Sequence, residues 1–214
     1  MPMRDNAKAR LPILALAAVL SILRSGLAAP TGTEPQPLST KQVQALLLKD
    51  RDFRNDTELI ALGEKALPGL VETLNASENQ IECERALWVL ARLKVEKQKV
   101  VPHIVPLLNR KAKWLKIYAL QALAAVDATE ASKDILALLN DDDEAIRVNA
   151  LRTLGAVGER SDAQEIQNAL KKRREKSNQA DVNNDHTFKE GDKAIAEIEK
   201  RENNRKNTVP QGTE

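Results

Sequence analysis

The sequence predicts an all-α fold, a right-handed α-α superhelix of about five stacked helix pairs. Residues 131–160 read as two short helices joined by an acidic turn. Related segments recur upstream at a spacing of just over thirty residues, which is typical of repeats that stack on one another. Aromatic residues make up only 2% of the chain. A composition dominated by leucine and alanine suits helices that approach one another closely.

The repeat unit is clearest in residues 131–160. Its first helix, within residues 134–140, carries isoleucine and leucine on one face. The acidic turn at residues 140–144 offers N-cap side chains to the helix that follows. That second helix has an apolar stripe formed by Ala150, Leu151, Leu154 and Val157. Neither helix can bury its stripe alone, so the pair is expected to stack on neighbouring pairs.

Sequence anchors align three full copies of this unit. Leu-Asn dipeptides separated by 34 and 31 residues end at Asn75, Asn109 and Asn140. An Ala-Leu-x-x-Leu signature follows each anchor and ends at Leu90, Leu123 and Leu154. Weaker copies around Leu59 and around Ile195 complete the five pairs. Atypical ends are expected of terminal, capping repeats.

The segments LGEKALPGLVETL and LLNDDDEAIRVNALRTLGAVGE resemble HEAT repeats, in the short form also called phycobilisome-lyase-like HEAT repeats. The third full copy carries the Asp and Arg positions of that family as Asp141 and Arg147. The middle copy has Arg110 and Lys116 at these positions. The resemblance covers about residues 55–170. It implies a HEAT/armadillo-like solenoid that acts as a scaffold or binding module.

The first 29 residues are expected to be a signal peptide. Basic residues precede an apolar run at residues 11–23, and small residues follow at 26–28. The run is short for a membrane span, so cleavage is expected to leave no integral span; an uncleaved anchor is the alternative. The protein is therefore expected to be exported, either periplasmic or extracellular. The remaining segments are expected to be a linker at 30–40, a repeat domain at 41–200 with a long loop at 177–187, and a disordered tail at 201–214.

No catalytic constellation is apparent in the sequence. It has only two histidines, His103 and His186, and no glycine-rich phosphate loop. Cys83, the single cysteine, stands where Arg147 stands in the third copy, and it is expected to be a small buried thiol. We therefore expect neither enzyme activity nor a catalytic residue.

The outward face of the second helices is the candidate partner-binding site. At about 100° per residue, the positions opposite the Ala-Leu stripe include four of the five aromatic residues, and six basic residues against one acid. The residues expected to bind are Arg85, Trp88, Arg92, Trp114, Tyr118, Gln121, Asn149 and Arg152. Second helices line the concave surface of a HEAT-type stack, where aromatic and arginine side chains can anchor a partner. The competing interpretation is that the aromatic rings pack between repeats and the charges form a solvated face.

A second candidate site is the stretch DVNNDHTFKEGD at residues 181–192, which resembles an EF-hand or dockerin calcium loop. The oxygen ligands implied are Asp181, Asn183, Asp185 and Asp192. His186 stands where such a loop has glycine, and Lys189 stands where it usually has a ligand. A polar connecting loop is the alternative. Calcium is the one cofactor that the sequence suggests.

The predicted function is non-catalytic protein–protein interaction or scaffolding through the concave face. The partner is expected to be another protein, with an acidic segment or an anionic polymer as the matching chemistry. Nucleic acid is not expected, because the basic run at residues 171–176 suits a helix C-terminus, and nucleic-acid binding would need a broader basic footprint and a non-secreted location. The alternatives are an accessory subunit of an enzyme system of the lyase type and a calcium-stabilised cell-surface adhesion module. The chain is expected to be a monomer.

Overall fold

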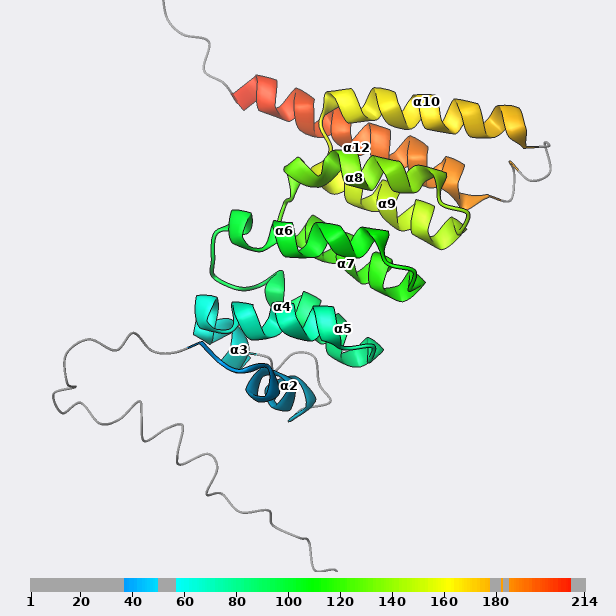
Figure 1. The fold of residues 1–214 in the computed structure, drawn as a ribbon. Coiled ribbons are helices and arrows are strands. Elements are labelled where there is room, and N and C mark those ends of the chain that lie inside the picture. Colours follow the sequence, from blue (N-terminus) through cyan, green and yellow to red (C-terminus); the bar gives the residue numbers. More distant parts are fainter. Residues whose placement is uncertain (1–36, 50–56, 178–181, 183–184, 209–214) are drawn as a thin grey trace, which may run out of the picture. The chain divides into compact units, whose positions relative to one another are not determined.

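Helices account for all the regular secondary structure that the computed structural model describes, in residues 37–49, 57–177, 182 and 185–208 (Figure 1). Within these residues they form five successive pairs, and the predicted all-α solenoid is confirmed. The first helices of the pairs are α2 (Thr40–Lys49), α4 (Leu67–Ala76), α6 (Val101–Ile104), α8 (Ser132–Ala137) and α10 (Arg160–Lys176). The second helices are α3 (Thr57–Leu62), α5 (Gln80–Leu90), α7 (Lys113–Ala125), α9 (Glu144–Val157) and α12 (His186–Thr208). Short 3₁₀ helices lie between them: η2 (Gly63–Lys65), η3 (Lys97–Lys99), η4 (Val105–Asn109), η5 (Thr129–Ala131) and η6 (Leu138–Asn140).

Short polar side chains start two of the second helices. The Asp143 carboxylate accepts hydrogen bonds from the backbone N–H groups of Ala145, at 2.8 Å, and Ile146, at 3.4 Å. Asn79 caps α5 in the same way. Each cap satisfies N–H groups that have no partner inside the helix. The acidic turn therefore starts α9 as the sequence predicts.

Breaks in the helices follow from the local sequence. Pro106 lies in the first turn of η4, where it has no N–H to continue the α6 ladder. At the end of α7, Asp127 adopts a left-handed conformation with φ of 53°. The N–H of Ala128 then reaches back to the carbonyl of Leu123, at 3.1 Å. This is a Schellman-type ending, which satisfies carbonyls that the helix leaves open.

The Ala-Leu-x-x-Leu signature forms the core. Its residues are buried in all three full copies: Ala86, Leu87, Leu90, Ala119, Leu120, Leu123, Ala150, Leu151 and Leu154. Successive second helices contact one another in the order α5, α7, α9, α12. Burying each leucine stabilises the stack by about 2 kcal/mol, so the register of the repeats is set by these side chains. Cys83 is buried in the same core as predicted, and burial raises the pKa of its thiol.

A glycine allows the last second helix to approach α9 closely. A Cβ added at Gly155 would lie 3.3 Å from Cα of Ala194 and 2.5 Å from Oε2 of Glu197. The main chains of α9 and α12 therefore meet where Gly155 has no side chain. Ala194, Ile195 and Ile198 bury the apolar face of α12 next to this contact.

Ion pairs connect each of two second helices to the turn of the next pair. Lys116 on α7 donates to Asp141 at 2.7 Å, and both side chains are mostly buried. Arg147 on α9 donates to Asp185 at 3.2 Å, and its side chain is only 3% exposed. Lys116 and Arg147 occupy the same repeat position, so lysine takes over the role of the family arginine in the middle copy.

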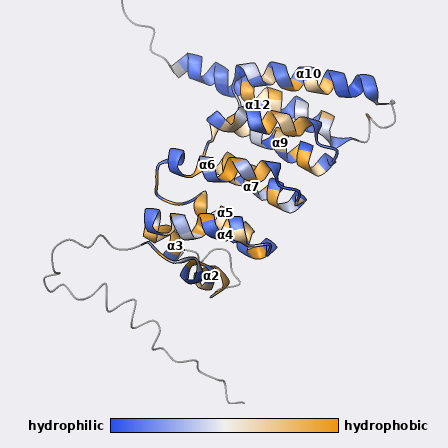
Figure 2. Cartoon of the chain, viewed as in Figure 1, coloured by the Kyte–Doolittle hydropathy of each residue, from blue (hydrophilic) through white to orange (hydrophobic). Residues whose placement is uncertain are grey.

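The C-terminal end of the stack differs from its prediction. Helix α12 continues to Thr208, so the expected disordered tail at 201–214 is wrong as far as residue 208. Arg201 contacts the end of α9 and holds this part of α12 in helical register. Figure 2 shows that α10 is mostly hydrophilic, as expected of a terminal repeat. The predicted signal peptide at 1–29 and the linker at residues 30–36 lie outside the described residues.

Candidate partner-binding face

We define the second-helix face as the outward side chains of α5, α7 and α9 with the turn that follows α5. Its members are Ile81, Trp88, Arg92, Trp114, Tyr118, Gln121, Ala125, Asn149 and Arg152, all of them half-buried or exposed. Seven of the eight predicted partner-binding residues belong to this face. Phe53, which the helical spacing also places outward, lies outside the described residues.

Arg85 is the predicted residue that the structure does not place on this surface. Its side chain is buried, with 3% exposed. Helix α5 is contacted by α2, α3, α4 and α7, so its outward strip is narrower than the spacing of an isolated helix suggests. Arg85 therefore belongs to the interior of the stack and is removed from the candidate site.

Tyr118 connects neighbouring repeats. Its ring lies 6.3 Å from that of Trp114, tilted by 54°, and both side chains pack against the core. Its hydroxyl accepts a hydrogen bond from the Gln80 side chain of α5 at 3.2 Å. Burial raises the pKa of Tyr118, and a hydrogen bond with Glu84 raises it further. The interpretation of aromatic packing between repeats therefore applies to Tyr118.

Trp88 and Arg92 form a stacked pair at the end of α5. The Arg92 guanidinium carbon lies 4.1 Å from the centroid of the Trp88 ring. One guanidinium nitrogen also donates to the backbone carbonyl of Trp88, at 3.2 Å. Trp88 is half-buried, whereas Arg92 is exposed. Within the described ranges no carboxylate forms an ion pair with Arg92, so its charge faces solvent in a fixed position.

Arg152, the cation of the other half of the face, is paired, and so is Lys193 on the neighbouring helix α12. Arg152 donates to Glu190 at 3.2 Å, and Lys193 lies 3.5 Å from Glu190 and 3.8 Å from Glu197. The net positive charge of this surface is therefore smaller in the folded chain than the helical spacing predicts, because Glu190 and Glu197 lie beside the cations. The sequence did not predict the contribution of Glu190 and Glu197, because both lie at positions of α12 outside its outward strip. Asn149 is turned to its own helix, where its side-chain amide donates to the carbonyl of Ala145 at 2.8 Å.

Apolar and cationic chemistry is concentrated between α5 and α7. Ile81 is 55% exposed and occupies the position on α5 that Trp114 occupies on α7. Gln121 and Ala125 are also exposed. We name this part of the second-helix face the α5–α7 patch, consisting of Ile81, Trp88, Arg92, Trp114, Gln121 and Ala125.

Asp185, one of the predicted calcium ligands, is held by protein donors. One carboxylate oxygen accepts from the backbone N–H of Thr187 at 2.9 Å. The other accepts from Arg147 at 3.2 Å and from Arg173 at 2.8 Å. Burial raises the pKa of Asp185, but the hydrogen bonds from Thr187 and Arg173 outweigh it and hold the pKa at about 2. Asp185 thus caps α12 and neutralises a buried arginine.

The remaining predicted calcium ligands are not brought together by the described residues. Asp181 and Asn183 lie outside them, and Asp192 is exposed, 4.0 Å from Arg174. In the part of the chain that the structure describes, no cluster of three or more His, Cys, Asp or Glu side chains could hold a metal ion. Calcium binding at residues 181–192 stays a prediction.

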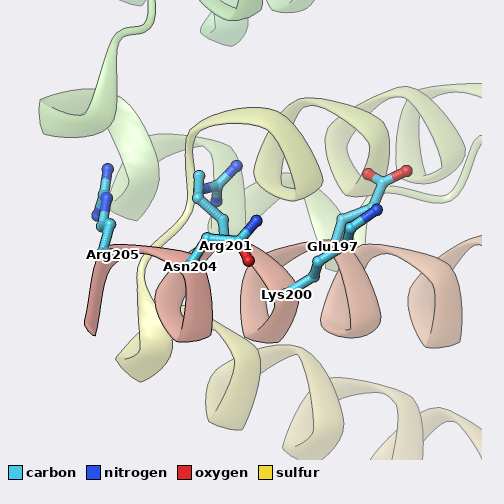
Figure 3. Close-up of a pocket in the computed structure, with 5 residues that line it drawn as sticks. All are labelled: Glu197, Lys200, Arg201, Asn204 and Arg205. Carbon is cyan, nitrogen blue, oxygen red and sulfur yellow. The ribbon is translucent and has the colours of Figure 1, made fainter. Parts of the chain in front are cut away.

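A shallow pocket lies on α12 at the C-terminal end of the stack (Figure 3). It is lined by Glu197, Lys200, Arg201, Asn204 and Arg205. Arg201 donates to the carbonyl of Gly155 at 2.7 Å and also bonds the carbonyls of Ala156 and Gly158. These carbonyls end α9, so Arg201 acts as a C-terminal cap and the pocket is the space beside it.

The fold and its outward face define an α-solenoid repeat protein. Residues 101–182, from the start of α6 to beyond the end of α10, match the family described as HEAT repeats. The chain therefore contains HEAT repeats, as its sequence predicts, and such repeats commonly mediate protein–protein interaction. None of the curated proteins compared with the chain matches it. No described helix is both long and apolar enough to cross a membrane.

Proposed function

We propose that this chain is an exported, non-catalytic interaction module that binds another protein through the second-helix face. The observation that carries the proposal is the α5–α7 patch, where exposed Ile81 lies on the same face as the stacked Trp88–Arg92 pair. Aromatic, aliphatic and arginine side chains of this kind are the usual anchors of protein interfaces. The matching partner is a segment of another protein bound along the concave side of the stack, by a single copy of the chain.

A charge placed on the exposed edge of the patch tests this proposal. Ala125 and Ala137 are both exposed alanines at the last position of a helix, Ala125 on second helix α7 and Ala137 on first helix α8. We expect Ala125→Glu to abolish capture of the partner in a pull-down from the extracellular or periplasmic fraction of the source cells. Ala137→Glu should capture it as the wild type does. Both variants should keep the wild-type free energy of unfolding within about 0.5 kcal/mol, because neither side chain packs in the core.

The design separates binding from folding. Truncating Trp88 or Tyr118 would remove packing as well as surface, because both side chains contact the core. Adding a carboxylate at Ala125 leaves those contacts intact. Equal capture by both glutamate variants would disprove binding through the second-helix face and direct attention to the first helices.

A further inference from the structure

We infer that the α5–α7 patch binds an extended peptide segment that combines an apolar side chain with a carboxylate about three residues away. This inference rests on the proposed function, and it assigns the chemistry and the spacing of the bound segment. It follows from the position of Arg92, from the ion pairs of Arg152, Lys193 and Lys113, and from the distance between Ile81 and the Trp88–Arg92 pair.

Arg92 is the cation that a carboxylate would meet. Stacking on Trp88 holds its guanidinium group in place, so little side-chain freedom is lost when an anion binds. Arg152 and Lys193 already share the carboxylate of Glu190, and Lys113 pairs with Asp143 at 2.7 Å. A partner carboxylate would have to displace an internal acid at those positions, but not at Arg92. The geometry therefore favours Arg92 as the point of charge recognition.

Two acids of α5 next to the patch are engaged by the chain itself. Glu84 is hydrogen-bonded with Tyr118, and Glu82 accepts from the hydroxyl of Ser77 at 2.7 Å. They offer less attraction to a basic ligand than the exposed Arg92 offers to an acidic one. Charge complementarity thus selects an acidic segment over a basic one.

Ile81 sets the spacing. It is 55% exposed, and burying it under a partner side chain would remove apolar surface from water. Arg92 lies in the turn after α5, but its guanidinium stacks on Trp88, which follows Ile81 by seven residues in the helix. At a rise of about 1.5 Å per residue, this places the charge about 10 Å from Ile81 along α5. An extended peptide advances about 3.3 Å per residue, so about three residues separate the apolar side chain from the carboxylate.

The test is a selection from phage-displayed random dodecapeptides on the immobilised full chain. Three chains are compared: wild type, Arg92→Glu, and Lys133→Glu as a control with the same charge change on the exposed side of α8. We expect wild type and Lys133→Glu to enrich peptides with Asp or Glu about three residues from an apolar residue. Arg92→Glu should instead enrich Lys or Arg at that position. Circular dichroism melting should show all three chains folded.

The apolar half of the inference is measured with one selected peptide, made synthetically and labelled with fluorescein. Ile81→Ser should weaken its binding at least about tenfold in fluorescence anisotropy. Leu48→Ser is the matched control, because Leu48 is 53% exposed but lies on α2, and binding should stay at the wild-type level.

Three outcomes would overturn the inference. They are enrichment of basic or uncharged peptides, enrichment of the same peptides on wild type and Arg92→Glu, and no enrichment at all. If one of these outcomes occurs while the Ala125→Glu variant still fails to capture the partner in the pull-down, the inference fails but the proposed function stands. If the partner is captured equally by both alanine-to-glutamate variants, the proposed function itself fails.

Discussion

Replacing Asp185 with asparagine should lower the melting temperature of this chain by about 9 °C, or about 3 kcal/mol in free energy of unfolding. The reason is Arg147, which is only 3% exposed and donates to the Asp185 carboxylate. Asparagine keeps the shape and can still cap α12, but it carries no charge to neutralise the buried guanidinium. Asp192→Asn is the matched control, because Asp192 is 69% exposed and its replacement should cost at most about 0.5 kcal/mol.

The pH dependence of the Asp185 effect gives an independent readout. The pKa of Asp185 is about 2 in the folded chain, whereas an unfolded aspartate has a pKa of about 3.9. A carboxyl with a lowered folded-state pKa stabilises the fold above the unfolded value, and this stabilisation is lost as the pH falls toward the folded value. The difference in melting temperature between wild type and Asp185→Asn should therefore be constant above about pH 5 and shrink from about pH 4 downward. A difference under about 2 °C at pH 7 would contradict the assignment.

The second large effect is expected from Gly155→Leu, which should destabilise the chain by about 3 kcal/mol. The Cβ of any residue at this position lies 3.3 Å from Cα of Ala194, so the further atoms of leucine have no room unless α12 moves away from α9. Thermal melting should give the magnitude. Limited proteolysis should show that cleavage between α10 and α12 becomes faster, because α12 is the helix displaced.

Gly155→Ala is the control for this substitution. Alanine in the middle of a helix is favoured over glycine by about 1 kcal/mol, and the short contact with Ala194 opposes this gain. We expect the two effects nearly to cancel. Adding Ala194→Gly to Gly155→Leu should recover part of the lost stability, since it removes the methyl group nearest the new side chain. Wild-type stability in Gly155→Leu would mean that α12 does not pack on α9 through this contact.

The repeat architecture could be predicted because its determinants are local or periodic. The Ala-Leu-x-x-Leu signature fixes which side of each second helix is buried, and Leu90, Leu123 and Leu154 are all in the core. Asp143 caps α9 because the capping group lies within the same turn. The length of α12 could not be predicted in this way. Its last turns are held by Arg201, whose partners lie on α9 more than forty residues earlier in the chain.

The site was harder to predict because surface chemistry depends on neighbours from other repeats. Helical spacing places Arg85 outward, but Arg85 is buried, and α5 is contacted by helices of both neighbouring pairs, α2 and α3 on one side and α7 on the other. Helical spacing also places Arg152 outward, where the sequence alone predicts a solvent-facing cation, but Glu190 on α12 neutralises it. The role of Asp185 also depends on residues distant in sequence, because a carboxylate in a polar loop can ligate calcium, cap a helix or pair with arginine. Arg147 and Arg173 are the neighbours that it meets here.

The polar links between repeats also determine where the stack is compliant. Lys116 and Arg147 each tie a second helix to the turn of the next pair. At the same register of α5 stands Cys83, whose thiol bonds the carbonyl of Ser77 within its own pair. The side chains of Gln80 and Tyr118 link α5 to α7 through an exposed hydrogen bond of 3.2 Å, which constrains the seam less than a buried ion pair does. Elastic bending should therefore concentrate at the seam between α5 and α7, directly beneath the α5–α7 patch. A partner spanning this seam would stiffen the solenoid, and by reciprocity a force that bends the solenoid would change the affinity for that partner.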